Sequence, residues 1–306
     1  MAFKDEAPDT TREFYHEGIW FPKMVLESSI TALSSFEVRS DDVWIVTYPK
    51  SGTHWMMEIV GLILNDGDPE KVDRTWTRCI EMSVDHGPAS KTTGESDEGD
   101  KSREPFLETL NEAPSPRVIQ SHLRLARFPR DMTKKAKVIY LARNPKDVVT
   151  SWFHFTNKNL PHFTHRSWEG ILKSFLEGET AWGPWPEHVR EFWEIRDEEG
   201  VLFLFYEDIL RDPLKHVKMV AQHLGRPLSA DVFQRVVENS SVDQMKQTYR
   251  KVGEIKDRNC QVPRLQFISK GVAGRWKNHF TVAQNELFDD WYRKQMEGSD
   301  IPISFE

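Results

Sequence analysis

The chain has 306 residues, of which 38% are hydrophobic and 29% charged, and its formal net charge is -7. This length suits one large α/β domain or two small ones, and no Pro/Gly/Ser-rich linker divides the chain, so we expect a single domain over residues 1–306. The negative charge argues against nucleic acid as the main partner, and any anion site must therefore be local.

The two cysteines, Cys79 and Cys260, are too few for a disulfide framework, which suits a reducing compartment. Residues 1–18 are polar and charged, and no later run approaches 18 apolar residues. We therefore expect a loose arm over residues 1–18, no membrane partner and a cytoplasmic location. The apolar patch that follows, Ile19 to Pro22, is too short for an element of its own and is expected to fold over another part of the chain.

The stretch from Val43 to Trp55 predicts a strand, a turn and a helix in direct succession. Val43 to Val46 are β-branched or aromatic and predict a buried strand, and Pro49 and Gly52 bracket the turn. The first turn of the following helix would present free N–H groups and the positive end of its dipole to the loop. The stretch therefore predicts a phosphate or sulfate site.

The residue order excludes a Walker P-loop, which reads G-x-x-x-x-G-K-[ST]. Here Lys50 precedes the glycine, and no earlier glycine stands in the loop. We therefore expect a different kind of phosphate loop, and not a P-loop kinase or nucleotide hydrolase.

Farther along, residues 86–105 can bury almost nothing and predict a mobile surface loop. Apolar strand patterns alternate with helical ones from residue 117 onward. The predicted strands are 117–122, 137–143 and 201–206, and the predicted helices are 146–158, 168–176, 187–198, 214–224 and 231–238. This alternation predicts an α/β fold with a central, mostly parallel sheet flanked by helices.

Ligands of such sheets lie beyond the carboxyl ends of the strands. Four polar residues stand at or just beyond the predicted strand ends: Lys50, His122, Arg143 and Tyr206. We therefore expect these side chains to meet at one edge of the sheet.

Four segments of this sequence resemble the cytosolic sulfotransferases, in the order that the family has them. They are Thr47–Thr53 (TYPKSGT), Tyr140–Asp147 (YLARNPKD), Leu204–Asp208 (LFYED) and Lys270–Thr281 (KGVAGRWKNHFT). That family transfers a sulfuryl group from 3′-phosphoadenosine-5′-phosphosulfate (PAPS) to a hydroxyl or amine and releases adenosine 3′,5′-bisphosphate (PAP). The resemblance extends from about residue 20 to the C-terminus. Because no His/Cys cluster stands at metal-ligand spacing in the sequence, we expect no metal.

The resemblance implies a role for residues along the whole chain. His122 would be the catalytic base, with Lys50 and Ser151 as further catalytic residues. The residues implied to bind the nucleotide are Lys50, Ser51, Gly52, Thr53, His54, Trp55, Arg143, Ser151, Tyr206, Ser240, Val242, Met245, Ser269, Lys270 and Gly271. Arg143 has an alternative from its spacing alone, an ion pair with Asp147 at i+4.

The implied acceptor is a small hydrophobic molecule such as a phenol, alcohol, steroid or monoamine. The residues implied to contact it are Phe21, Gln120, His122, Phe155 and Trp182. The segment around Phe21 either covers the core edge or lines this site. The 86–105 loop, which looks like an insertion near the acceptor, is either an inert solvated loop or a lid.

Three positions depart from the family pattern. Gln120 replaces a lysine, Val242 replaces an aromatic residue that stacks on adenine, and Ser269 replaces an arginine that grips the 3′-phosphate. These departures leave open an alternative, a catalytically weak nucleotide-binding protein on the same fold.

Residues 277–286 fit the family's dimer segment, K-x-x-x-T-V-x-x-x-E, at every fixed position. We expect a weak homodimer through this segment, because so short an interface buries little area. The alternative is that the segment simply leads into a helix carrying Leu287 and Trp291.

Overall fold

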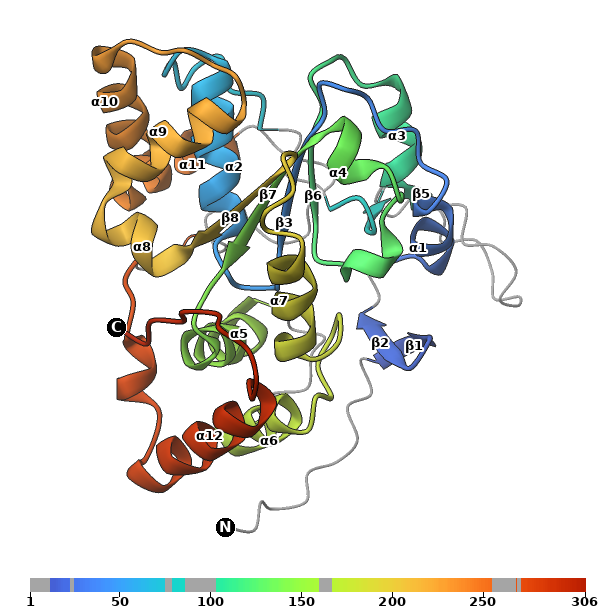
Figure 1. The fold of residues 1–306 in the computed structure, drawn as a ribbon, viewed down its shortest axis with the longest axis vertical. Helices are drawn as coiled ribbons and strands as arrows, with labels where there is room; N and C mark the ends of the chain where they lie inside the picture. Colours follow the sequence, from blue (N-terminus) through green and yellow to red (C-terminus); the bar gives the residue numbers. More distant parts are fainter. Residues whose placement is uncertain are drawn as a thin grey trace.

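The computed structural model describes residues 12–22, 25–74, 79–85, 103–159, 167–254, 268 and 271–306. Its centre is a sheet of four parallel strands in the order β6–β3–β7–β8 (Figure 1). These strands are β3 (Val43–Thr47), β6 (Val118–Ser121), β7 (Lys137–Ala142) and β8 (Val201–Phe205). The predicted parallel sheet is confirmed, and all four carboxyl ends lie at the same edge.

One face of the sheet is covered by helices drawn at the upper left of Figure 1. They are α2 (Thr53–Leu64), α8 (Tyr206–Arg211), α9 (Pro213–His223), α10 (Ala230–Asn239) and α11 (Val242–Glu254). Val43 and Ile45 of β3 pack on this side with the apolar residues of α2 and α9. Trp44 and Val46 point to the opposite face, as the two-residue period of a strand requires.

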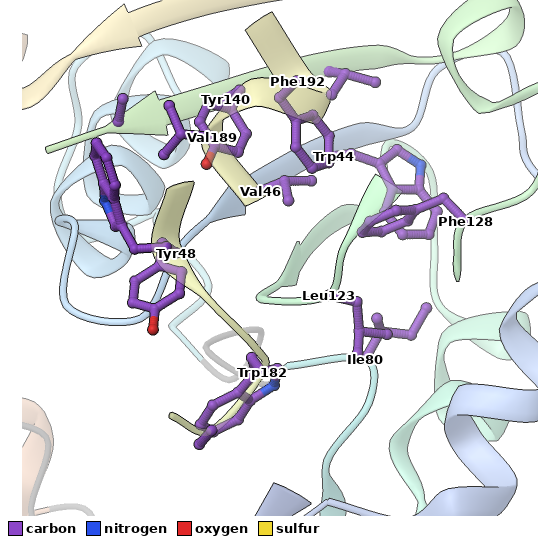
Figure 2. Close-up of a cluster of buried hydrophobic side chains, with 14 of the residues drawn as sticks. Trp44, Val46, Tyr48, Ile80, Leu123, Phe128, Tyr140, Trp182, Val189 and Phe192 are labelled. Atoms are coloured by element: carbon purple, nitrogen blue, oxygen red, sulfur yellow. The ribbon is translucent and has the colours of Figure 1, made fainter. Parts of the chain in front are cut away.

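The opposite face packs against an aromatic core that includes Trp44, Tyr140 and Phe192 (Figure 2). Tyr140 of β7 stacks on Phe192 with 4.4 Å between ring centroids, and Trp44 meets Phe128 edge-on at 5.5 Å. The elements around this face and the carboxyl edge are α1 (Glu27–Leu33), α3 (Phe106–Glu112), η1 (Leu125–Arg127), α4 (Met132–Lys135), α5 (Pro145–Asn159), α6 (Trp168–Leu176), α7 (Trp185–Glu194), η3 (Arg275–Asn278) and α12 (Val282–Gln295).

The N-terminal region differs from the sequence-based expectation. Residues 12–16 of the predicted loose arm form strand β1 (Arg12–His16), which pairs antiparallel with β2 (Ile19–Pro22). The patch 19–22, predicted to be too short for an element, is therefore one strand of a hairpin. Glu17 and Gly18 connect the two strands with φ of 49° and 79°, and a turn with positive φ at both central residues matches the twist of a hairpin.

A second antiparallel pair, β4 (Ser83–Asp85) and β5 (Arg103–Pro105), flanks the predicted loop 86–105. The last three residues of that loop are thus in a strand, while residues 86–102 lie outside the described residues. Within the described ranges, no helix has the length and apolar character needed to cross a bilayer.

Candidate functional site

The loop between β3 and α2 brings backbone donors and small side chains together at the carboxyl edge. Lys50 and Gly52 both have positive φ, 71° and 111°, so the chain turns sharply into the first residue of α2, Thr53. The hydroxyl of Ser51 is buried and has no hydrogen-bond partner within the described part of the chain. A helix N-terminus with an adjacent buried hydroxyl and a lysine is suited to an oxyanion.

Gly52 is required by its backbone angle and by its neighbours. A Cβ at this position would lie 2.8 Å from Cδ2 of Tyr206 and 3.2 Å from Cδ2 of Leu141. A side chain here would therefore have to displace the tyrosine ring or the loop.

We expect Gly52→Ala to lower the free energy of unfolding by about 1–3 kcal/mol and to weaken anion binding at this loop. Gly225→Ala is the matched control, because Gly225 also has positive φ, 64°, but a Cβ added there would meet no atom within 4 Å. Thermal unfolding compares the two variants, and equal losses of stability would show that the contact with Tyr206 has no effect.

His122 lies just past the end of β6 with a defined tautomer. Its Nδ1 is 2.8 Å from the carbonyl oxygen of Thr47, which can only accept, so Nδ1 carries the proton and Nε2 carries the lone pair. The hydroxyl of Thr47 lies 3.2 Å from the same nitrogen and 2.7 Å from the hydroxyl of Thr53. The imidazole is thereby held at the end of β3 through Nδ1, and its basic nitrogen is Nε2.

Burial lowers the pKa of His122, and the Glu81 carboxylate and the Thr47 carbonyl oppose that effect. His188 and Lys50 act in the same direction as burial. A lowered pKa keeps the imidazole neutral at neutral pH, which is the protonation state that a general base needs.

The ammonium of Lys50 lies 3.8 Å from the ring centroid of Phe155, a cation–π contact. Burial lowers the pKa of Lys50 to about 7, with a further contribution from the nearby Arg143. A lysine with so low a pKa is half-neutral near pH 7, and an anion placed in the loop would favour its protonated form.

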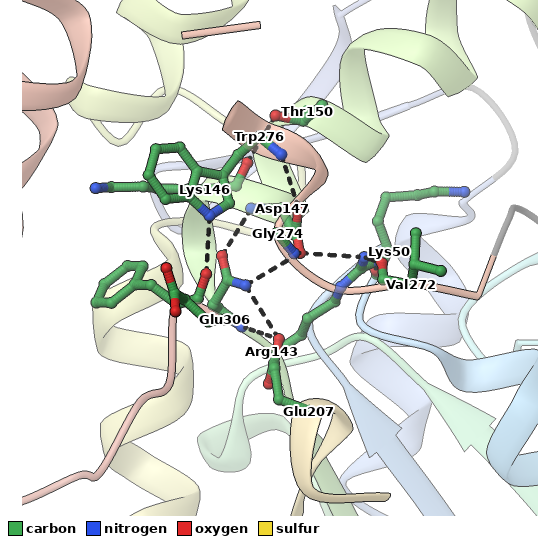
Figure 3. Close-up of polar contacts among 12 residues, drawn as sticks. Lys50, Arg143, Lys146, Asp147, Thr150, Glu207, Val272, Gly274, Trp276 and Glu306 are labelled. Carbon is green, nitrogen blue, oxygen red and sulfur yellow. Dashed lines mark hydrogen bonds and ion pairs between the residues drawn. The ribbon is translucent and has the colours of Figure 1, made fainter. Parts of the chain in front are cut away.

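Arg143 is buried at the end of β7 and lies beside the loop and the returning chain (Figure 3). Its guanidinium donates to the carbonyl oxygens of Lys50 at 3.1 Å and Val272 at 3.5 Å. It also lies 4.4 Å from the ring centroid of Tyr206, and its Nε is buried without a partner among the described residues.

The alternative partner of Arg143, Asp147, is also in reach, with 3.6 Å between guanidinium and carboxylate. Asp147 accepts hydrogen bonds from the backbone N–H groups of Gly274 and Trp276 at 2.8 and 3.0 Å. The carboxylate thus holds the chain around residues 271–276 beside Arg143. The Arg143 guanidinium forms this ion pair and still has its Nε donor without a partner in the described ranges.

An aromatic pair lies on the α2 side of the loop. Trp55 and Tyr206 meet edge-on at 5.2 Å, and the indole N–H of Trp55 donates to the carbonyl of Ser240 at 2.9 Å. Next to them, a Cβ on Gly271 would lie 2.1 Å from Cγ2 of Val242. The predicted nucleotide residues from four distant segments are therefore adjacent, with the buried Met245 one turn after Val242 on α11.

Aromatic rings line the other side of the loop in a continuous series. Phe21 meets Trp182 at 6.4 Å, Trp182 meets Trp152 at 6.4 Å, and Trp152 meets Phe155 at 6.2 Å. Trp182 also packs edge-on against His122 at 5.5 Å. Three of the predicted acceptor residues, Phe21, Trp182 and Phe155, are thus linked through Trp152 in an apolar wall that runs from the hairpin to Lys50.

The remaining predicted residues are placed as follows. Gln120 is buried on β6, His54 is half-buried in the first turn of α2, and Ser151 is half-buried on α5. Ser151 stands four residues after Asp147 and four before Phe155, so the three share one face of the helix. Ser269 and Lys270 lie outside the described residues.

Glu81 is a residue near His122 that the sequence reasoning missed. Its buried carboxylate accepts hydrogen bonds from the His122 N–H at 2.9 Å and the Trp182 indole at 3.1 Å. It stands in the weakly patterned stretch 74–105, where no motif or strand end marks it. No group of three His, Cys, Asp or Glu residues is placed to hold a metal ion in the ranges described.

Comparison with known proteins gives a consistent result. A family model described as a sulfotransferase domain matches residues 40–300. Sulfotransferase 1A1 of Rattus norvegicus is 38% identical over 284 residues, which cover 91% of this chain and 92% of the relative.

Two solved structures are similar over nearly the whole chain. Mouse sulfotransferase SULT7A1 complexed with PAP has a TM-score of 0.75 and 31% sequence identity, covering 94% of this chain and 95% of that one. Retinol dehydratase in a complex with retinol and PAP has a TM-score of 0.77 and 26% identity, covering 94% and 90%.

Proposed function

The chain belongs to the sulfotransferase domain family, and we propose that it transfers a sulfuryl group from PAPS to the hydroxyl or amine of a small hydrophobic acceptor. The observation that carries this proposal is the placement of His122. The Thr47 carbonyl at the end of β3 fixes Nδ1 of His122, the imidazole packs edge-on against Trp182 of the aromatic wall, and Nε2 is left as the basic nitrogen. An acceptor held by the wall would present its hydroxyl to that nitrogen.

The residues around the loop fit a 3′,5′-substituted nucleotide. The buried hydroxyl of Ser51 and the buried Nε of Arg143 are both donors without a partner in the described ranges. Gly52 lets the loop backbone pack closely on the buried ring of Tyr206, and Trp55, half-buried beside that ring, offers an aromatic surface next to the loop. Both similar structures contain PAP, which supports the same nucleotide here.

The chemistry assigns a separate task to each residue. His122 takes the proton of the acceptor hydroxyl as the acceptor oxygen bonds to sulfur. Lys50 stabilises the negative charge that develops on the 5′-phosphate oxygen as its bond to sulfur breaks, and the loop amides share that task. Arg143 and Ser151 are proposed to hold the 3′-phosphate.

A panel assay tests the proposal and its rival. The purified protein is incubated with PAPS and phenols, alcohols, steroids or monoamines, and sulfated products are detected by mass spectrometry. Because Phe21, Phe155 and Trp182 supply an apolar wall, we expect turnover with hydrophobic hydroxyl compounds. Binding of PAP without any sulfated product would favour the alternative, a catalytically weak nucleotide-binding protein.

We propose the cytoplasm as the place of this reaction, since the buried Cys79 is a free thiol that a reducing compartment preserves.

The segment 277–286 is proposed to form a weak two-fold interface. Thr281 caps α12 through a capping box with Gln284, and the next residue, Val282, is 76% exposed. A large apolar side chain held on a rigid helix N-terminus is suited to self-association.

We expect Val282→Glu to convert a concentration-dependent dimer into a monomer, because two buried carboxylates would face each other across the two-fold axis. Light scattering measures the mass. Tyr15→Glu on the hairpin is the matched control, since Tyr15 is also a strongly exposed large side chain, 56% exposed, and lies on a different element. The same mass for wild type and Val282→Glu would refute the interface.

A further inference from the structure

Glu81 is fully buried, and its carboxylate has a side-chain hydrogen bond with Cys79 and accepts others from groups at and near His122. Oε1 accepts from the backbone N–H of His122 at 2.9 Å and from the indole of Trp182 at 3.1 Å. Oε2 accepts from the hydroxyl of Ser121 at 2.9 Å. Two N–H groups and a hydroxyl donate hydrogen bonds to this carboxylate, and an ionised carboxylate can only accept hydrogen bonds.

The backbone around Glu81 is held independently of these contacts. Cys79 forms a parallel bridge with Gln120, and Ile80 donates to the Gln120 carbonyl at 3.0 Å. On the other side, the carbonyl of Glu81 accepts from the N–H of Leu26 at 3.1 Å. The segment therefore runs along β6 and delivers the carboxylate to the strand end where His122 begins.

We propose that Glu81 is a positioning residue of the active site, which fixes His122 and Trp182 with one carboxylate and stabilises the imidazolium that forms when His122 accepts the acceptor's proton. This inference rests on the proposed function. The proton moves from the acceptor hydroxyl to Nε2 of His122, and the positive charge that results lies beside a buried negative one.

Other groups also act on the His122 imidazole, and they define its electrostatic surroundings. At the end of β3 the Thr47 carbonyl favours the charged form, and Lys50 in the following loop opposes it. From α7, His188 opposes it, while its Nε2 donates to the His122 carbonyl at 2.9 Å. Of the groups that raise the pKa of His122 against the effect of burial, Glu81 has the largest influence.

The test separates charge from geometry with two variants. Glu81→Gln keeps an oxygen for the His122 and Trp182 N–H groups, so it removes the charge while both of these groups keep their acceptor, and only the hydrogen bond from Ser121 has to reverse. Glu81→Asp keeps the charge on a shorter side chain and shifts the hydrogen bonds. The His122 ring is titrated by NMR in the nucleotide-free protein, and kcat is measured over pH.

We expect the pKa of His122 to be lower in Glu81→Gln than in wild type, with the acidic limb of the pH–rate profile moved to lower pH. The kcat should fall about tenfold, because the imidazolium that forms loses its buried counter-charge. In Glu81→Asp the pKa of His122 should remain near the wild-type value while kcat falls, because the imidazole is less well placed.

Each outcome has a defined meaning. An unchanged pKa of His122 in a folded Glu81→Gln protein overturns the inference. A wild-type kcat in Glu81→Asp also overturns it, and this second measurement decides the question if Glu81→Gln does not fold. If wild type transfers no sulfuryl group, the proposed function fails, whereas the NMR titration still decides whether Glu81 acts on His122.

Discussion

Replacement of His122 by alanine should lower the rate of sulfuryl transfer by about 10²-fold or more, because the base that takes the acceptor's proton is lost. Nε2 carries the lone pair, since Nδ1 donates to the Thr47 carbonyl at 2.8 Å. PAP should bind to His122→Ala with near wild-type affinity, because the loop donors and Arg143 do not depend on the imidazole. Turnover assays and calorimetry measure the two effects separately.

His216→Ala is the matched control. His216 is also buried, but it lies on α9 and bonds to the Asp212 carbonyl at 2.7 Å, on the helical face remote from the aromatic wall. That variant should retain turnover. Normal turnover by His122→Ala would remove His122 from the role of base.

Replacement of Lys50 by methionine should lower the transfer rate by about 10²-fold, since the charge on the departing phosphate oxygen loses its cation. Methionine keeps an apolar stem beside Phe155, so the wall should remain intact. The variant should also change the number of protons that the protein takes up when the nucleotide binds.

Whether protons are taken up or released on binding follows from the lowered pKa of Lys50, about 7 in the nucleotide-free protein. A bound phosphate raises that pKa, so at pH 8 wild type should take up close to one proton when PAP binds, and its affinity should fall as pH rises above 7. Calorimetry in buffers of different ionisation enthalpy measures this uptake, which Lys50→Met should lose. Lys294→Met on the exposed face of α12 should behave as wild type.

Equal proton uptake by wild type and Lys50→Met would show that another group titrates on binding. In that case the low pKa of Lys50 would have no part in nucleotide recognition.

The sheet could be predicted from sequence because its central strands, β3 and β7, are buried on both faces. Val43 to Val46 are a continuous apolar run, and β3 is buried along its whole length between two neighbours. The same argument located Lys50, His122 and Arg143 at strand ends, which the fold brings to one edge.

Elements that depend on tertiary contacts were not predicted. Helix α11 turns Met245 and Tyr249 into the core, an i, i+4 pair too sparse to mark a helix by itself. The hairpin needed recognition of the turn at Glu17 and Gly18. Glu81 could not be assigned, because its role follows from contacts with residues about 40 and 100 positions later in the chain.

The position of Arg143 shows a further limit of motif reasoning. Phosphate binding and an ion pair with Asp147 are alternatives in the sequence, whereas in the fold the guanidinium lies 3.6 Å from Asp147 and still has its Nε without a partner among the described residues. The carboxylate that pairs with Arg143 also accepts from Gly274 and Trp276, so the ion pair holds this segment beside the proposed nucleotide site.

The most direct measurement is the stoichiometry of transfer with PAPS and a hydrophobic phenol. We expect PAP and the sulfated phenol to appear in equal amounts, and both rates to fall together in His122→Ala and in Lys50→Met. Release of PAP without sulfated phenol, or no PAP with any acceptor of the panel, would contradict the claim that this site transfers a sulfuryl group.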